Sequence, residues 1–252
     1  MSAAPSSLTM LRRMTVTELR LAVREPLVGA FVFAFPIVLV LVLGGIFGET
    51  DGSFEGAKPS DYYVAAYVAV AIGAIGLVML PGQIAAYRER GVLRRFRAAG
   101  VAGWVFPTAI ALVSLVMALA AAVAIAITAW LSYGLPGLAD PVRTLGFGAL
   151  GAVAFVSFGT LIGWLMPSSR SAQGVGLVLF IPMFLLGGGG PPPDALTDVM
   201  NDVATWLPLT HVLRAVQEPW LDIGTGGDHA LVLLAIFGVC TAAWVSLSRR
   251  AD

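Results

Sequence analysis

The chain has 252 residues, of which 58% are hydrophobic and only 12% are charged. A soluble domain carries roughly 25% charged residues, and helices that are apolar all round need lipid or a much larger core around them. The composition therefore excludes a soluble globular protein and predicts an all-α membrane protein. The single cysteine, Cys240, excludes an intramolecular disulfide framework.

The first segment of the chain is basic and amphipathic. Met10–Glu25 can form a helix with Arg13, Arg20 and Arg24 on one face and apolar residues on much of the other, although Glu18 interrupts the apolar face. This pattern predicts an N-terminal helix that lies at the membrane interface. The alternative interpretation is a basic flank that only obeys the topology rules.

Six stretches are long and apolar enough to cross the hydrocarbon core, which takes about 20 residues. The third stretch, 98–139, has about twice that length, and we interpret it as one helix between Trp104 and Tyr133, where interfacial aromatic residues are expected. All of residues 1–252 are assigned to a single transmembrane domain. The predicted spans are approximately 27–48, 62–84, 104–133, 144–166, 172–190 and 229–248.

Charged residues are segregated between the two ends of these spans. With both termini inside the cell, twelve of the fifteen Lys and Arg residues flank the inner ends, and eleven of the fifteen acids lie outside. Lys and Arg near span ends stay on the cytoplasmic side, and a seventh span would put Arg249 and Arg250 outside. The sequence therefore predicts a six-span protein of the bacterial plasma membrane with cytoplasmic N- and C-termini.

The apolar stretches contain no Asp, Glu, Lys or Arg. Because intramembrane ionisable groups mark proton and ion pathways, their absence argues against a proton-coupled carrier, an ion pump or an intramembrane enzyme. His211 and His229 lie near the predicted outer surface. We interpret them as solvated or interfacial histidines, so no metal site is predicted.

The segment between the second and third spans is the most informative one. It holds five arginines and one glutamate, yet it keeps Val92, Leu93 and Phe96 at helical spacing. A purely topological loop needs charge but no apolar stripe, whereas a short amphipathic helix that docks on a cytoplasmic partner uses both. The alternative is a helix that lies on anionic headgroups. The candidate residues are Arg88, Glu89, Arg90, Gly91, Val92, Leu93, Arg94, Arg95, Phe96 and Arg97.

Four glycines and three prolines follow the fifth predicted span, and they cannot continue a helix. The next residues predict an amphipathic helix at the outer interface, with Asp194, Asp198 and Asp202 along one solvated face. Residues 207–213 are too short to span and too apolar to be free in water, so they predict a partial re-entry. The residues that define this outer hairpin are Gly190, Pro191, Pro192, Pro193, Leu207, Pro208, Leu209 and Thr210.

These segments, in this order, resemble the membrane subunit (permease) of ABC-2 type exporters over nearly the whole chain. The stretch from Arg88 to Phe96 is similar to the family's ERxxGTLxxL stretch, and Leu207-Pro208-Leu209-Thr210 is similar to its NPLT-like motif. The sequence departs from the family's pattern at Val92, where Thr is usual, at Gly100, where Pro is frequent, and at Leu207, where Asn is common. These departures leave the subfamily open.

The resemblance implies that two permease chains, in a homodimer or with a related permease, enclose a path powered by two copies of a separate ABC ATPase. The loop 88–97 would then be the helix that couples the ATPase to the spans. A Walker A loop needs Gly-Lys-Ser/Thr, and the sole lysine, Lys58, lies between Ala57 and Pro59. This chain is therefore expected to have no catalytic residues and no cofactor, because ATP and Mg²⁺ bind the partner, and no nucleic acid partner is expected.

The expected function is export of an amphiphilic or hydrophobic substrate, a drug or lipid-like compound, with the drug-efflux branch favoured. A permease for lipid-linked polysaccharide and a non-transporting membrane scaffold or sensor are the alternatives. Gly73 and Gly76 are small enough to let helices approach closely in a dimer. The apolar residues that would line a path, or equally face lipid or other helices, include Phe31, Phe35, Met79, Phe155 and Phe180.

Overall fold

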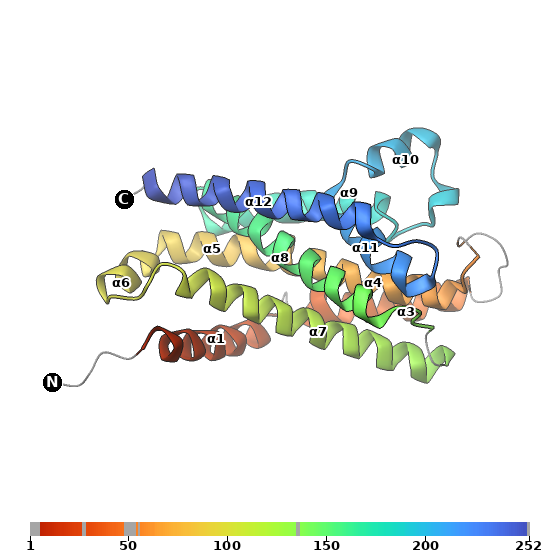
Figure 1. Cartoon of the computed structure of the whole chain (residues 1–252), viewed down its shortest axis with the longest axis horizontal. Helices are drawn as coiled ribbons and strands as arrows, with labels where there is room; N and C mark the ends of the chain where they lie inside the picture. Colours follow the sequence, from red (N-terminus) through yellow and green to blue (C-terminus); the bar gives the residue numbers. More distant parts are fainter. Residues whose placement is uncertain (1–5, 27–28, 48–53, 55, 135–136, 251–252) are drawn as a thin grey trace.

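The computed structural model describes residues 6–26, 29–47, 54, 56–134 and 137–250. Over these ranges the regular structure is helical throughout, and the long helices run side by side in one bundle (Figure 1). Six helical segments are long and apolar enough to cross a membrane. The predicted fold class, an all-α membrane protein with six spans, is therefore confirmed.

The first candidate span joins η1 (Gly29–Ala34) to α3 (Phe35–Ile46). The second is continuous through α4 (Pro59–Ala74), the π-helical segment η2 (Ile75–Met79) and α5 (Leu80–Glu89). The remaining four are α7 (Val105–Tyr133), α8 (Pro141–Leu165), α9 (Ser169–Leu186) and α12 (Gly227–Arg250).

Five shorter elements lie outside the spans. Helix α1 precedes the first span, α6 joins α5 to α7, and the other three elements lie between α9 and α12 (Figure 1). Their bounds are Ser7–Arg24 for α1, Val92–Ala98 for α6, Pro193–Ala195 for η3, Asp198–Ala204 for α10 and Pro208–Leu221 for α11.

The observed spans agree with the predicted ones in number and differ at their ends. The long third stretch is one helix that begins at Val105, as predicted. The second span extends beyond the predicted 62–84 at both ends, and α9 stops at Leu186, before the predicted residue 190. Residues 27, 28 and 48 of the first predicted span lie outside the described residues.

Both ends of the described chain lie at the same end of the bundle as α6, and α10 lies at the opposite end (Figure 1). We call these the coupling end, which includes α6 and the α8–α9 turn at 166–168, and the hairpin end, which includes α10 and the turn at 222–226. An even number of crossings requires both termini at one end. The arrangement therefore agrees with six spans.

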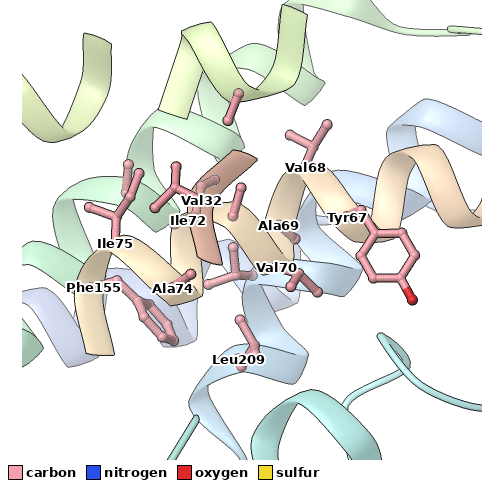
Figure 2. Close-up of a cluster of buried hydrophobic side chains, with 14 of the residues drawn as sticks. Val32, Tyr67, Val68, Ala69, Val70, Ile72, Ala74, Ile75, Phe155 and Leu209 are labelled. Carbon is pink, nitrogen blue, oxygen red and sulfur yellow. The ribbon is translucent and has the colours of Figure 1, made fainter. Parts of the chain in front are cut away.

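The second span is the centre of the bundle. In its most apolar stretch 94% of the residues are buried, whereas the first, fifth and sixth spans are 22%, 22% and 17% buried. Figure 2 shows Phe155 of α8 and Leu209 of α11 in the same cluster as Tyr67, Ile72 and other side chains of α4. This span therefore forms the core on which the other helices pack.

Close helix packing in this core depends on glycine. Pro81 cannot donate to the carbonyl of Leu77, and the π-helical segment η2 lies immediately before it. A Cβ at Gly176 would collide with the carbonyl oxygen of Leu77, and a Cβ at Gly159 would collide with that of Gly76. Helices α8 and α9 therefore approach the backbone of the central span where only glycine fits.

Gly73 and Gly76 do not face a second chain. A Cβ on Gly73 would lie 2.6 Å from Leu209 Cδ1, and a Cβ on Gly76 would lie 2.6 Å from Phe155 Cβ. Both glycines therefore make room for helices of their own chain. The sequence did not identify the seam of a dimer, and these two glycines do not mark one, because they pack within the most buried span.

Candidate functional site

The coupling end begins with α1, which packs on α7 and reaches α5 through a buried carboxylate. Glu18 is only 4% exposed. It accepts hydrogen bonds from Gln83 Nε2 at 2.8 Å and from the Tyr87 hydroxyl at 2.7 and 2.8 Å. Glu18, which seemed to interrupt the apolar face in the sequence, is therefore the polar anchor at the centre of the packed face.

The environment of Glu18 acts on its ionisation in two opposing ways. Burial raises the pKa of the Glu18 carboxyl, because the charged form loses hydration. The hydrogen bonds from Tyr87 and Gln83 oppose this rise by stabilising the carboxylate, but burial is the larger effect. The contact therefore responds to pH at values above those at which a glutamate ordinarily titrates.

Two glycines separate α6 from the neighbouring helices. Gly91 has φ +69° between α5 and α6, and Gly100 has φ +76° before α7. Glycine adopts this left-handed conformation without the steric cost that a Cβ carries. The predicted coupling segment is therefore a separate short helix between two sharp turns.

The apolar side of α6 packs on the chain's own helices. The Phe96 ring centroid lies 6.4 Å from that of Phe106 in α7, and Leu93 also packs against the core. Leu93 and Phe96 line a cavity of about 170 Å³ together with Trp164 and Trp244. Leu93 and Phe96 therefore anchor α6 to the bundle, but both stay half-buried, and the docking of this helix on a cytoplasmic partner stays a prediction.

The polar side of α6 faces outward. Glu89, Arg90, Arg94 and Arg95 are exposed, and Val92 is half-buried. The side chain of Arg97 lies outside the described part of the structure. The residues that α6 offers to a partner are therefore mainly its arginines.

Arg88 and Glu89 connect the coupling segment to the α8–α9 turn. The Arg88 guanidinium lies 5.8 Å from the centre of the Trp164 ring and donates to the carbonyl oxygen of Met166. Glu89 Oε2 accepts a hydrogen bond of 3.3 Å from the backbone N–H of Ser169. The sequence analysis did not connect these two inner loops, because Glu89 and Ser169 are 80 positions apart and no local pattern links them.

The opposite end of the bundle holds the predicted hairpin, which starts deep among the helices. The backbone of Gly187, Gly188 and Gly189 is buried, and the Tyr67 hydroxyl donates a 2.6 Å hydrogen bond to the Gly189 carbonyl. Non-helical backbone at membrane depth needs this kind of protein partner. The glycine run therefore ends α9 inside the bundle.

The proline run then leads away from the bundle. Gly190 is half-buried, Pro191 is exposed and Pro192 is buried. Pro193 opens the 3-10 turn η3, and its side chain lies outside the described part of the structure. The prolines therefore form the segment that connects the buried glycine run to α10.

Helix α10 is shorter than predicted. It begins at Asp198, so Asp194 belongs to η3 and the predicted row of three acids on one helix is wrong. Val199 and Trp206 are 72% and 85% exposed. This outward apolar side agrees with the predicted interfacial position, because such side chains favour lipid or a second chain over water.

The predicted re-entry is a longer helix than 207–213. Leu207 is the N-cap of α11, Pro208 starts the helix, and Leu209 packs on Gly73 in the middle of the central span. The helix continues to Leu221, where the carbonyl of Trp220 accepts from Ala139 N at 3.0 Å in the α7–α8 loop. Helix α11 therefore begins in the interior of the bundle and ends at the hairpin end, and it does not run the full length of the bundle.

The aromatic candidates for a path are mostly packing residues. Phe31 contacts Phe35 and Phe180, with ring centroids 5.9 and 6.5 Å away, and Phe184 stacks on Phe180 at 6.1 Å. Phe155 is fully buried in the core. These rings fill the space between helices, which is one of the roles that the sequence left open.

The histidines are not separate surface groups. His211 Nδ1 and His229 Nδ1 are 2.9 Å apart, and His229 Nε2 lies 3.3 Å from Glu218 Oε1. Over the described ranges no three His, Cys, Asp or Glu side chains converge as metal ligands. The sequence offered no local signal for this pair, since α11 and α12 turn back on each other to form it.

Comparison with known proteins adds two findings. The family described as ABC-2 type transporter matches residues 9–219. A protein of Bacillus subtilis (strain 168) named "Putative transport permease YvfS" is 34% identical over 80 residues, which cover 29% of this chain and 32% of that relative. The chain thus matches about a third of the relative's length.

Proposed function

Because the chain belongs to the ABC-2 type transporter family, we propose that it exports an amphiphilic or hydrophobic substrate, a drug or lipid-like compound, across the bacterial plasma membrane. It is the membrane-spanning permease subunit and has no ATPase of its own, so an ABC ATPase is its partner. ATP and Mg²⁺ bind that partner. The proposed complex contains two permease chains and two ATPase subunits.

The observation that carries this proposal is the way in which α6 is held. Its apolar side is packed on Phe106, and its entry is tied to the α8–α9 turn through Arg88. A displacement of α6 by an ATPase would therefore reach α5, α7 and the α8–α9 turn together. The exposed Arg94 and Arg95 would bind an acidic surface of the ATPase.

The direction of transport follows from the proposed orientation. We place the coupling end in the cytoplasm, with both termini, because Arg88, Arg90, Arg94, Arg95 and other arginines gather there. The hairpin end then faces the outside of the cell. An ATPase at the cytoplasmic coupling end can drive export toward the hairpin end.

The substrate path is proposed to form between two permease chains. The central span is almost wholly buried, whereas only 22%, 22% and 17% of the residues in the most apolar stretches of the first, fifth and sixth spans are buried. Apolar helices with this much free surface contact lipid or a second bundle. A homodimer, or a pair with a related permease, would thus enclose an apolar route suited to drugs, and lipid-linked polysaccharide is the second candidate.

The test is reconstitution with the candidate ABC ATPases of the same genome. The permease and one of these ATPases should co-purify, hydrolyse ATP in nanodiscs and move a fluorescent amphiphilic dye in inverted vesicles. The double variant Arg94→Glu/Arg95→Glu should lose ATPase binding, whereas Arg143→Glu at the hairpin end should keep it. If the double variant assembles and transports like wild type, the coupling assignment fails. If no ATPase binds the wild type, the chain is a scaffold or sensor instead.

A further inference from the structure

A cavity of about 320 Å³ opens at the hairpin end, where α9, α10, α11 and α12 meet. Its walls combine Leu186, Gly187, Gly188 and Ala204 with a group of polar side chains. Among the residues that the structure describes, neither Asp nor Glu lines it. The polar lining comprises Tyr62, Asn201, Thr205, Thr210, His211, Arg214 and His229.

The first turn of α11 lies at this cavity. Pro208 has no N–H, and the Thr210 N–H donates to the carbonyl of Leu207, so the 14-residue helix α11 offers the cavity the positive end of its dipole and not a row of free N–H groups. Thr210 in this turn is 9% exposed, and its hydroxyl has no hydrogen-bond partner. A buried hydroxyl without a partner is costly, which points to a ligand that accepts from it.

Two histidines lie beside the helix terminus. His229 Nε2 lies 3.3 Å from the Glu218 carboxylate, and His211 hydrogen-bonds the backbone of Thr205. The Nδ1 atoms of the two rings are 2.9 Å apart, which is hydrogen-bond distance.

The electrostatic surroundings of the two histidines are mixed. Burial, and to a smaller extent the neighbouring His229, lower the pKa of His211. Arg214 adds a permanent positive charge to the lining. The other acids of this end, Asp198, Asp202 and Asp228, are exposed and do not line the cavity.

We propose that this cavity binds a phosphate-type anion at the positive end of the α11 dipole, with the Thr210 hydroxyl and Arg214 as its donors and the His211–His229 pair beside it. Helix N-termini and arginine together are a common means of holding phosphate. Ligand sites span roughly 300–1,000 Å³, so this cavity accommodates a headgroup and not a whole amphiphile. The anion belongs either to a membrane phospholipid or to a soluble phosphate ester, and its binding does not depend on transport.

The first arm of the test uses sulfate, because its charge is constant between pH 6 and pH 8. Purified permease in a maltoside detergent, without any ATPase, should be stabilised against heat by sulfate and by inorganic phosphate but not by chloride. The sulfate affinity should rise as the pH falls, since protonation of His211 adds positive charge. His211→Gln should remove this pH dependence.

Two variants probe the donors independently. Thr210→Val keeps the shape of the side chain and should weaken sulfate binding by about tenfold, because it removes one hydrogen bond to a charged group. Arg214→Gln should weaken it further. Arg143→Gln, an exposed arginine at the same end of the bundle, is the matched control and should bind as wild type.

The second arm identifies the source of the anion. Vesicles of phosphatidylglycerol should stabilise the wild type over vesicles of a neutral galactolipid if a lipid headgroup enters, and Thr210→Val should reduce that difference. Stabilisation by sulfate alone assigns the site to a soluble phosphate ester. The proposal is overturned if neither sulfate, phosphate nor phosphatidylglycerol stabilises the wild type, or if Thr210→Val and Arg214→Gln both bind as wild type.

Discussion

The Tyr87 hydroxyl donates a 2.7 Å hydrogen bond to the buried carboxylate of Glu18, and this contact joins α1 to the helix that leads into α6. The same carboxylate accepts from Gln83 one turn earlier. Tyr87 also packs edge-on against Phe106, the residue that holds Phe96 of α6. The N-terminal helix α1 and the coupling helix α6 are therefore both held in place by the packed pair of Tyr87 and Phe106.

Glu18→Ala should release α1 from α5. The variant leaves the Tyr87 hydroxyl and the Gln83 amide without their acceptor, and a hydrogen bond to a charged group contributes about 1.5–3 kcal/mol. We expect faster trypsin cleavage within α1 and a lower unfolding temperature in detergent. Glu25→Ala, at the exposed end of the same helix, should change neither measurement.

The docking of α1 should strengthen on acidification. Burial raises the pKa of Glu18 in the folded protein, so the folded state binds the proton more tightly than the unfolded state. Stability therefore increases as the pH falls through the folded-state pKa toward the ordinary glutamate value. Protection of α1 from proteases that tolerate acid should rise in this window in wild type. Glu18→Gln, which cannot ionise, should be insensitive, and an equal pH response in both proteins would contradict the assignment.

Gly159→Ala should be strongly destabilising. A Cβ at this position would collide with the carbonyl oxygen of Gly76, and backbone cannot yield as a flexible side chain does. Overpacking of this kind costs about 1–3 kcal/mol or more. Gly146→Ala in the same helix has nothing within 4 Å of the new Cβ and should be neutral or slightly stabilising. Thermal unfolding of the two variants in one detergent measures the difference.

Arg88 and Arg95 should affect different properties. Arg88→Gln removes the contact with Trp164, a cation–π interaction of about 0.5–2 kcal/mol, and the donor to Met166, so it should lower the unfolding temperature. Arg88→Lys should restore this only in part, because lysine lacks the planar guanidinium. Arg95→Gln is exposed and should change stability by less than about 0.5 kcal/mol. Equal unfolding temperatures for Arg88→Gln and wild type would show that the link between the two inner loops is not structural.

The proposed topology should be visible by cysteine labelling in a Cys240→Ser background. Cysteines at Asp198 and at Thr225 flank the re-entrant helix α11 and should both react with a membrane-impermeant maleimide from outside intact cells. A cysteine at Arg94 should react only after permeabilisation. Labelling of Asp198 and Thr225 from opposite sides would mean that α11 crosses the membrane.

The number of spans, their approximate bounds and the separate coupling and hairpin segments could be predicted from the sequence. These features follow from local properties: the length of an apolar run, the period of a stripe, or glycines and prolines that cannot continue a helix. The segregation of arginine likewise predicts an orientation without any tertiary contact.

The pairing of distant residues could not be predicted in this way. The burial of Glu18 on Tyr87 joins positions 69 apart. The inward packing of Phe96 and the meeting of His211 with His229 depend on how two successive helices turn back on each other. The apolar stripe of α6 or the carboxylate of Glu18 could equally face lipid, a partner protein or the chain's own core. The sequence by itself determined which segments enter the membrane, because partition between water and lipid acts on each segment separately. Only the tertiary structure decided which side chains face one another, because that depends on how closely the glycines of the central span allow the other helices to approach.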